Sequence, residues 1–148
     1  MESKKRLTIY CHYDKNGLVE ECDQFLISEL CSVSRDIIIV VNGILGEDGI
    51  RFFNNISDEV YHRPNTGLDA KAYEYVILEC IKRGRIQEYD ELILCNNTFF
   101  GPFISLKEIF RTMEKKVVDF WGFDYGERGI YRYIRSYFLV FRRSEERR

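Results

Sequence analysis

The stretch DIIIVVN, Asp36–Asn42, decides the fold class of this chain. It is continuously apolar from Ile37 to Val41, and every one of these residues is β-branched. A strand with one face in water alternates apolar and polar residues, whereas an unbroken β-branched run is typical of a strand that is covered on both faces. The stretch therefore predicts a buried strand in an α/β protein with a mostly parallel sheet.

The neighbouring segments extend this pattern in both directions. Further strands are predicted at Arg6–Tyr13, Glu59–His62 and Glu91–Asn96, and within Val117–Phe123 and Ser136–Arg143. Helices are predicted over Leu18–Leu30, over a second stripe that ends at Gly84, and after a capping box of Ser105 with Glu108; the segment 47–56 is helical or irregular. Strands that alternate with helices imply right-handed crossovers. We expect one domain, residues 1–148, with three α/β/α layers.

Composition excludes several classes of protein. The 148 residues are 45% hydrophobic and carry a net charge of −2, which suits a compact domain and gives no basic field for nucleic acid. No apolar run approaches the roughly 20 residues of a membrane span, and the first residues lack the apolar core of a signal peptide. We expect a cytoplasmic protein, with peripheral contact at the inner face of a membrane left open.

Polar residues follow four of the predicted strands. Ligands of open α/β sheets bind beyond the carboxyl ends of the strands, so these residues are expected along one edge. Each also has a structural explanation: Asp69, for example, is expected to cap its helix. Arg63 lies just before a helix N-terminus and would suit a phosphate group. The candidate ligand-binding residues are Tyr13, Asp14, Asn42, Arg63, Asn65, Gly67, Asp69, Asn96, Asn97 and Thr98.

Two common phosphate-binding motifs are absent from the sequence. There is no G-x-x-x-x-G-K-[ST], so a P-loop NTPase is not indicated. CHYDKNG stands where a dinucleotide-binding protein would carry G-x-G-x-x-G after its first strand. An α/β domain without either loop favours a nucleotide-sugar fold.

Five blocks of sequence resemble a known family. The blocks YCHYDKNGLVEECDQFLISEL, RPNTGLDAKAYEYVI, YDELILCNNTFFGPF, DFWGF and RSYFLVFRR resemble successive segments of the rhamnan synthesis protein F family. The family resembles GT-A glycosyltransferases, which have a Rossmann-like fold and use nucleotide-diphosphate sugars. The resemblance implies a glycosyltransferase domain that transfers a sugar such as rhamnose to a growing cell-surface polysaccharide, on a free or lipid-linked glycan acceptor.

The resemblance also implies roles for single residues. Tyr13, Asp14 and Asn42 would border the base and ribose of the donor, and Arg63 would face its diphosphate. The remaining donor contacts would come from Asn65, Gly67 and Asp69, and from the end of the strand at Asn96, Asn97 and Thr98.

Metal dependence is left open by the residues. The position of Asn96-Asn97-Thr98 corresponds to the Asp-x-Asp metal motif of the GT-A fold, so Asn97 is the candidate ligand of Mg²⁺ or Mn²⁺. These cations prefer charged oxygen ligands, and the tripeptide has no carboxylate. Arg63 and a helix terminus could instead neutralise the leaving diphosphate.

Catalysis needs a base, and Asp124 in WGFDYGER is the candidate. An exposed loop aspartate is the alternative interpretation of this residue. Compared with a complete GT-A domain, the chain chiefly contains the donor half, and the acceptor half is apparently missing. A non-catalytic nucleotide-sugar-binding or scaffolding module is therefore the rival prediction, and self-association is left open.

Overall fold

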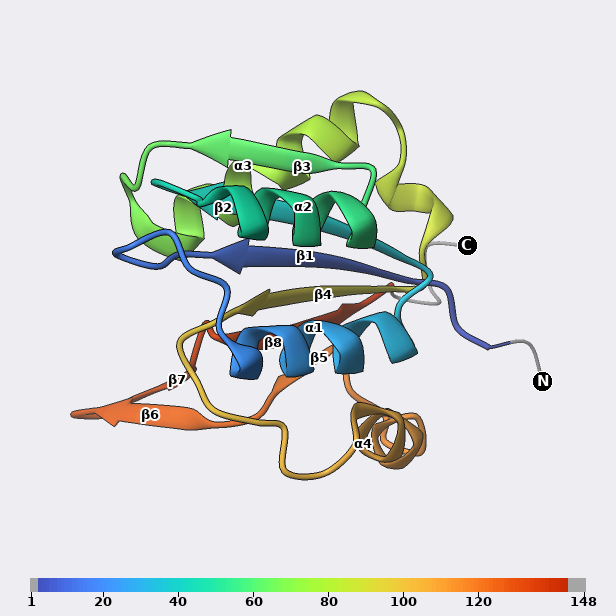
Figure 1. The fold of residues 1–148 in the computed structure, drawn as a ribbon. Coiled ribbons are helices and arrows are strands. Elements are labelled where there is room, and N and C mark those ends of the chain that lie inside the picture. Colours follow the sequence, from blue (N-terminus) through green and yellow to red (C-terminus); the bar gives the residue numbers. More distant parts are fainter. Residues whose placement is uncertain (1–2, 144–148) are drawn as a thin grey trace.

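The chain folds around one six-stranded sheet, and a computed structural model describes residues 3–143 (Figure 1). The strands are β1 (Arg6–His12), β2 (Asp36–Asn42), β3 (Val60–Arg63), β4 (Glu91–Asn96), β5 (Phe120–Gly122), β6 (Tyr125–Arg128), β7 (Tyr131–Ile134) and β8 (Phe138–Arg142). The helices are α1 (Glu21–Val33), α2 (Glu47–Ile56), α3 (Leu68–Lys82) and α4 (Leu106–Met113), with a 3₁₀ turn at Ile86–Glu88.

The topology confirms an α/β fold with a mostly parallel sheet. The strand order is β3-β2-β1-β4-β8-β5; β1 pairs in parallel with β2 and β4, and β2 with β3. Strand β8 runs antiparallel to both β4 and β5. The chain moves outward from β1 through β2 to β3 and then returns to the other side of β1 with β4. The order thus reverses between β1 and β4, where open α/β sheets place their ligands.

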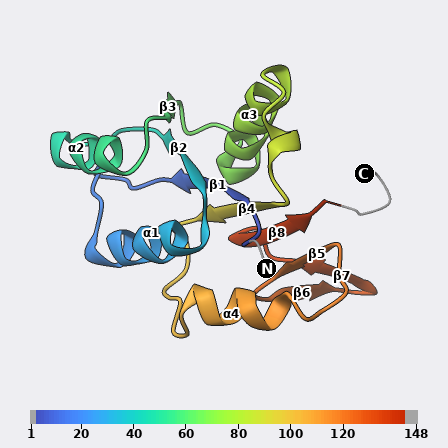
Figure 2. The ribbon, with the colours of Figure 1, turned by 90° about the vertical axis from the view of Figure 1, so that its right-hand side faces the viewer.

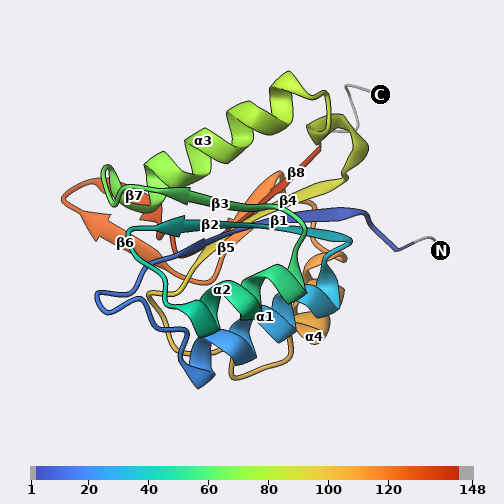
Figure 3. The ribbon, with the colours of Figure 1, turned by 45° about the horizontal axis from the view of Figure 1, so that its top comes forward.

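Helices cover both faces of the sheet, as predicted (Figures 2 and 3). Helices α1, α2 and α4 pack on the face that carries Tyr10 and Ile39, and α3 packs on the face that carries Ile9 and Val40. Because side chains of a strand alternate between faces, the apolar run of β2 supplies both cores. No helix within residues 3–143 is long and apolar enough to cross a membrane.

The helix ends confirm some predicted signals and correct others. Helix α1 begins after Glu20, where Glu20 and Asp23 form a reciprocal capping box, and not at Leu18. Helix α3 ends at Lys82 with Arg83 as its C-cap residue, so the predicted glycine, Gly84 at φ +68°, follows the cap by one residue. Ser105 is the N-cap residue of α4, but its side chain makes no capping bond, so the predicted capping box is wrong. The N–H of Leu106 instead donates to the carboxylate of Glu29 on α1, at 2.7 Å.

A buried carboxylate joins the middle strands at the end where β1 begins. The side chain of Glu91 on β4 is fully buried; it lies 2.6 Å from Arg6 Nε on β1 and 2.8 Å from Arg142 Nε on β8. Lys4 Nζ lies 3.5 Å away. Burial by itself would raise the pKa of Glu91, but the hydrogen bonds and charges of Arg6 and Arg142, helped by Lys4, lower it below its ordinary value.

We expect Glu91→Gln to lower the free energy of unfolding by about 3–5 kcal/mol, because it leaves buried guanidinium groups without their counter-charge. Urea unfolding at pH 7 measures the loss. Asp48→Asn is the control: Asp48 also pairs with an arginine, Arg51, but its side chain is 96% exposed, so the unfolding midpoint should not move. An equal loss in both variants would contradict the role given to Glu91.

The last residue of β1, His12, is buried and fully hydrogen-bonded. Its Nε2 donates to the carbonyl of Leu18 at 2.9 Å, which leaves Nδ1 to accept from the hydroxyl of Tyr10 at 3.4 Å. The ring also packs edge-on against Phe53. This arrangement suits the neutral imidazole, and burial is the main cause that lowers the pKa of His12.

A lowered histidine pKa makes the fold sensitive to mild acid. In the unfolded chain the imidazole of His12 takes up a proton near pH 6.5, whereas in the folded chain it stays neutral to a lower pH. Stability should therefore be full above about pH 6.5 and should fall as the pH decreases from there towards the folded pKa. Urea unfolding between pH 7.5 and 5.5 measures this slope. We expect His12→Gln to remove most of this dependence of stability on pH, and His62→Gln, a change at an exposed histidine, to leave it unchanged. The reverse result would refute the assignment of the effect to His12.

Candidate functional site

A cavity of about 510 Å³ lies where β1, β2 and β4 end. It therefore coincides with the reversal of strand order between β1 and β4. Predicted site residues on its wall are Tyr13, Asn42, Asn65, Asp69, Asn96, Asn97 and Thr98. The wall is completed by Cys11, Leu68, Tyr133, Ile134, Arg135, Ser136 and Tyr137. Residues from five separate parts of the sequence thus share one hollow.

Asn97 joins the loop after β4 to the loop after β1. Its side-chain oxygen accepts from the backbone N–H of Tyr13 at 3.2 Å, and its amide nitrogen donates to the carbonyl of Tyr13 at 3.0 Å. Tyr13 remains 46% exposed and lies on the wall. The two loops at the reversal point are therefore held together, and an aromatic surface is left for a ligand.

Asp69 connects three segments on the cavity wall. Its Oδ2 accepts from Asn96 Nδ2 and from Ser136 Oγ, both at 2.8 Å. Asn96 Oδ1 in turn accepts from the backbone N–H and the hydroxyl of Thr98. The predicted capping role of Asp69 is confirmed in part: Gly67 is the N-cap residue of α3, but Asp69 Oδ1 accepts from the first-turn backbone N–H of Ala70 at 2.9 Å. The carboxylate also fixes the start of α3 against β4 and the segment before β8.

Arg63 supports the cavity without lining it. Its guanidinium donates to Asn42 Oδ1 at 2.7 Å and to the carbonyl of Thr66 at 2.9 Å. Asn42 Nδ2 then donates to the carbonyl of Leu68 at 3.1 Å. These bonds hold a strained turn, because Gly67 and Leu68 both have left-handed backbones, at φ +73° and +54°. Such strain is unusual for leucine and is found mostly at functional sites.

Asp14 and Gly67 also lie outside the cavity wall. Asp14 Oδ1 accepts from the backbone N–H groups of Asn16 and Leu18, each at 2.8 Å. The bond from Leu18 is the main cause that lowers the pKa of Asp14. Gly67 supplies the left-handed backbone before α3. In the structure both residues shape loops beside the cavity.

A hairpin that the sequence reading missed supplies one side of the cavity. Strands β6 and β7 pair with each other and not with the main sheet. The segment from Tyr133 to Tyr137, at and after the end of β7, lines the wall. The hairpin has residues exposed on both faces, so it lacks the alternation that marks a strand. The sequence signal that could have indicated the hairpin is Gly129, which has φ +63° in the two-residue turn between β6 and β7.

Asp124, the predicted base, lies at the foot of this hairpin. Its Oδ2 is 2.8 Å from Arg135 Nε, and its Oδ1 accepts from the backbone N–H of Tyr125. Asp124 is not among the wall residues, whereas Arg135 is. Among the described residues, Asp69 is the only carboxylate on the wall.

The wall offers a poor donor set for a divalent cation. Both polar ends of the Asn97 amide are bonded to Tyr13, and Asp69 Oδ2 already accepts two hydrogen bonds. Within residues 3–143 no three or more His, Cys, Asp and Glu side chains gather as a metal cluster. Mg²⁺ and Mn²⁺ prefer carboxylate oxygens, so the amides present here do not fit them well.

Comparison with known proteins identifies the family. The model of the family described as rhamnan synthesis protein F matches residues 37–145, which is more than half of the chain. No curated protein matches the sequence. The match includes four of the five sequence blocks, all but the first, and confirms the family resemblance; it runs from within β2 to the end of β8, so it covers most of the cavity wall. The chain therefore belongs to the rhamnan synthesis protein F family, and its role lies in polysaccharide biosynthesis.

Proposed function

We propose that this chain is a glycosyltransferase domain of the GT-A type that binds a nucleotide-diphosphate sugar in the 510 Å³ cavity. The observation that carries the proposal is the position of that cavity, at the carboxyl edge where the strand order reverses between β1 and β4. Its volume lies in the range of small-molecule sites. Family membership supplies the reaction class, the building of a polysaccharide.

The chemistry of the wall suits each part of such a donor. The exposed ring of Tyr13 offers a stacking surface for a base, and the amides of Asn42 and Asn65 can bond ribose or sugar hydroxyls. Arg135 is the arginine on the wall, so we assign it the diphosphate contact that the sequence suggested for Arg63. In this proposal Arg63 does not contact the donor itself; it orients Asn42, which does.

Sugar transfer requires the leaving diphosphate to be stabilised and the acceptor hydroxyl to lose a proton. Arg135 can serve the first need while it holds Asp124 at 2.8 Å. If the diphosphate draws Arg135 towards the cavity, Asp124 is released as a base near the acceptor side. Asp69 is the alternative base, since it lies on the wall. A rhamnose-type donor and a glycan or lipid-linked glycan acceptor complete the proposal.

A non-catalytic nucleotide-sugar-binding module is the second candidate. It is favoured because both candidate bases already have partners in the structure. Asp69 accepts hydrogen bonds from Asn96 and Ser136, and Asp124 pairs with Arg135. This candidate shares donor binding with the first and differs only in turnover.

Donor binding is tested by isothermal titration with nucleoside diphosphates and dTDP-rhamnose, with and without Mn²⁺. We expect Arg135→Gln to weaken binding about 10- to 100-fold, the effect of losing one charge-assisted hydrogen bond. Arg132→Gln is the matched control, because Arg132 pairs with Glu127 on the same hairpin and lies off the wall. Equal effects of the two variants, or no binding by the wild type, would refute the donor site.

Turnover is measured separately, as release of dTDP from dTDP-rhamnose with a glycan acceptor. We expect Asp124→Asn to reduce the rate at least 100-fold while donor affinity changes little, as for a general base. If the rate of dTDP release fell in Asp69→Asn and not in Asp124→Asn, the base would be Asp69. Donor binding without turnover in the wild type would support the binding module.

A further inference from the structure

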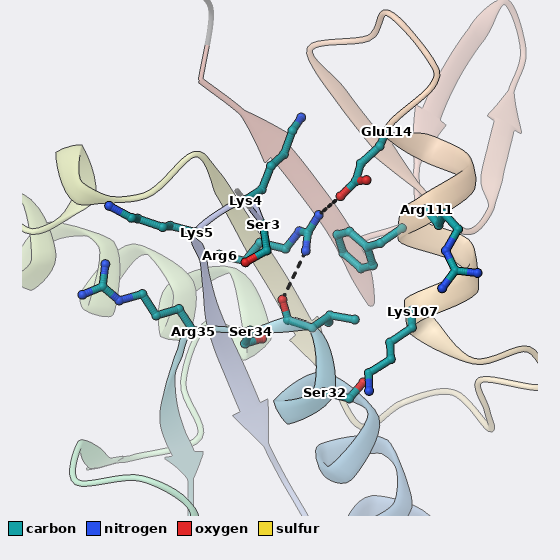
Figure 4. Close-up of a pocket in the computed structure, with 12 residues that line it drawn as sticks. Ser3, Lys4, Lys5, Arg6, Ser32, Ser34, Arg35, Lys107, Arg111 and Glu114 are labelled. Carbon is teal, nitrogen blue, oxygen red and sulfur yellow. Dashed lines mark hydrogen bonds and ion pairs between the residues drawn. The ribbon is translucent and has the colours of Figure 1, made fainter. Parts of the chain in front are cut away.

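A second hollow lies at the opposite end of the sheet, around the start of β1 (Figure 4). Its volume is about 650 Å³. Three segments line it: residues 3–6, the end of α1 with the turn to β2 at residues 32–35, and helix α4. We call it the basic groove, after its charged residues Lys4, Lys5, Arg6, Arg35, Lys107 and Arg111.

The charge of the basic groove contrasts with that of the chain. Six cationic side chains line it, and among the described lining residues Glu114 is the only carboxylate. The whole chain carries a net charge of −2. Positive charge is therefore concentrated in this hollow, and composition does not account for it.

Three of the six cations already lie close to carboxylates of the protein. Arg6 is buried; it pairs with Glu91 and with Glu114, and its guanidinium lies 4.5 Å from the ring centre of Phe110. Lys4 lies 3.5 Å from the carboxylate of Glu91. Arg35 Nε lies 3.7 Å from Asp36.

The other three cations have no such partner. Across residues 3–143, no carboxylate lies within ion-pair distance of the side chains of Lys5, Lys107 and Arg111. All three residues are exposed. Figure 4 shows Lys107 extending from α4 towards the end of α1, near Ser32, whereas the side chain of Lys5 extends away from α4. The charges of Lys107 and Arg111, on one helix, are therefore available to one ligand.

The two cations on α4 affect the helix that carries them in different ways. Lys107 and Arg111 are four residues apart on α4, so they share a face and repel each other. Arg111 lies in the last turn, where a cation is favourable for the helix dipole, but Lys107 lies in the first turn, beside the positive end of the dipole. Helix stability therefore gives no reason for the charge of Lys107, and a bound anion would relieve its penalty.

We propose that the basic groove binds a ligand with two or more phosphoryl groups, chiefly through Lys107 and Arg111 on α4. The serines contribute less, because Ser32 already donates its hydroxyl to the carbonyl of Glu29. The groove is wide for a single phosphate ion, but its volume suits a diphosphate compound. The same chemistry is presented by clustered headgroups of an anionic membrane. This site is separate from the donor cavity, which lies at the other edge of the sheet.

The probe for the soluble source is inorganic pyrophosphate in low-salt buffer, with the melting temperature as readout. We expect a saturable rise for the wild type and none for the double variant Lys107→Gln/Arg111→Gln. The control Arg51→Gln/Lys82→Gln removes two exposed charges from other helices and should keep the rise. Arg135→Gln should keep it as well, which separates the basic groove from the donor cavity.

The probe for the membrane source is co-sedimentation with phosphatidylcholine vesicles, with and without phosphatidylglycerol. Binding that needs phosphatidylglycerol and is lost in Lys107→Gln/Arg111→Gln assigns the basic groove to headgroups. A pyrophosphate response without vesicle binding assigns it to a soluble ligand. Failure of both probes with the wild type overturns the proposal.

The single variant Lys107→Gln tests the argument from helix stability. Without any anion, it should melt at the same temperature as the wild type or higher, because it removes a cation from the first turn of α4. A lower melting temperature would show that Lys107 stabilises the fold, and would overturn the proposal. Circular dichroism of the variant at low temperature verifies that it is folded.

Discussion

The buried carboxylate of Glu91 is the interaction on which the middle of this structure depends. It joins β4 to Arg6 on β1 and to Arg142 on β8, so the parallel and antiparallel parts of the sheet meet at one charge. Arg6 carries the connection further, to Glu114 after α4 and to the carbonyl of Val33 at the end of α1. A buried carboxylate between two arginines is stable only as a set, because each ion has lost its water.

The two ends of the sheet differ in the chemistry of their side chains. At the start of β1, Glu91 and Glu114 neutralise Arg6, and the surrounding lysines and arginines are left to form the basic groove. At the other end, most polar groups are neutral amides and hydroxyls that bond to one another around the cavity. The first end therefore offers net positive charge, and the second offers directed hydrogen bonds, to the ligands that we propose for them.

The cavity at the carboxyl edge is organised before any ligand arrives. Asn97 holds the loops after β1 and β4 together, and Asp69 ties α3 to Asn96 and Ser136. The left-handed backbone at Leu68 persists because Asn42 binds its carbonyl and Arg63 binds Asn42. Bonds of this kind reduce the entropy that a ligand must remove on binding, which is what a site for a flexible nucleotide-sugar needs.

Local patterns were sufficient to predict the layers, the strands near the centre and the edge of the sheet that carries the cavity. The unbroken run in β2 indicates burial on both faces, and parallel strands bring Tyr13, Asn42 and Asn96 to one edge whatever their side chains do. Only the tertiary structure decided which polar groups face the cavity. Arg63 turned to Asn42, and Arg135 reached the wall from a hairpin with no amphipathic pattern. Side-chain direction depends on partners distant in sequence, such as Asp69 and Asn96, which are 27 positions apart. Periodicity carries no information about such pairs.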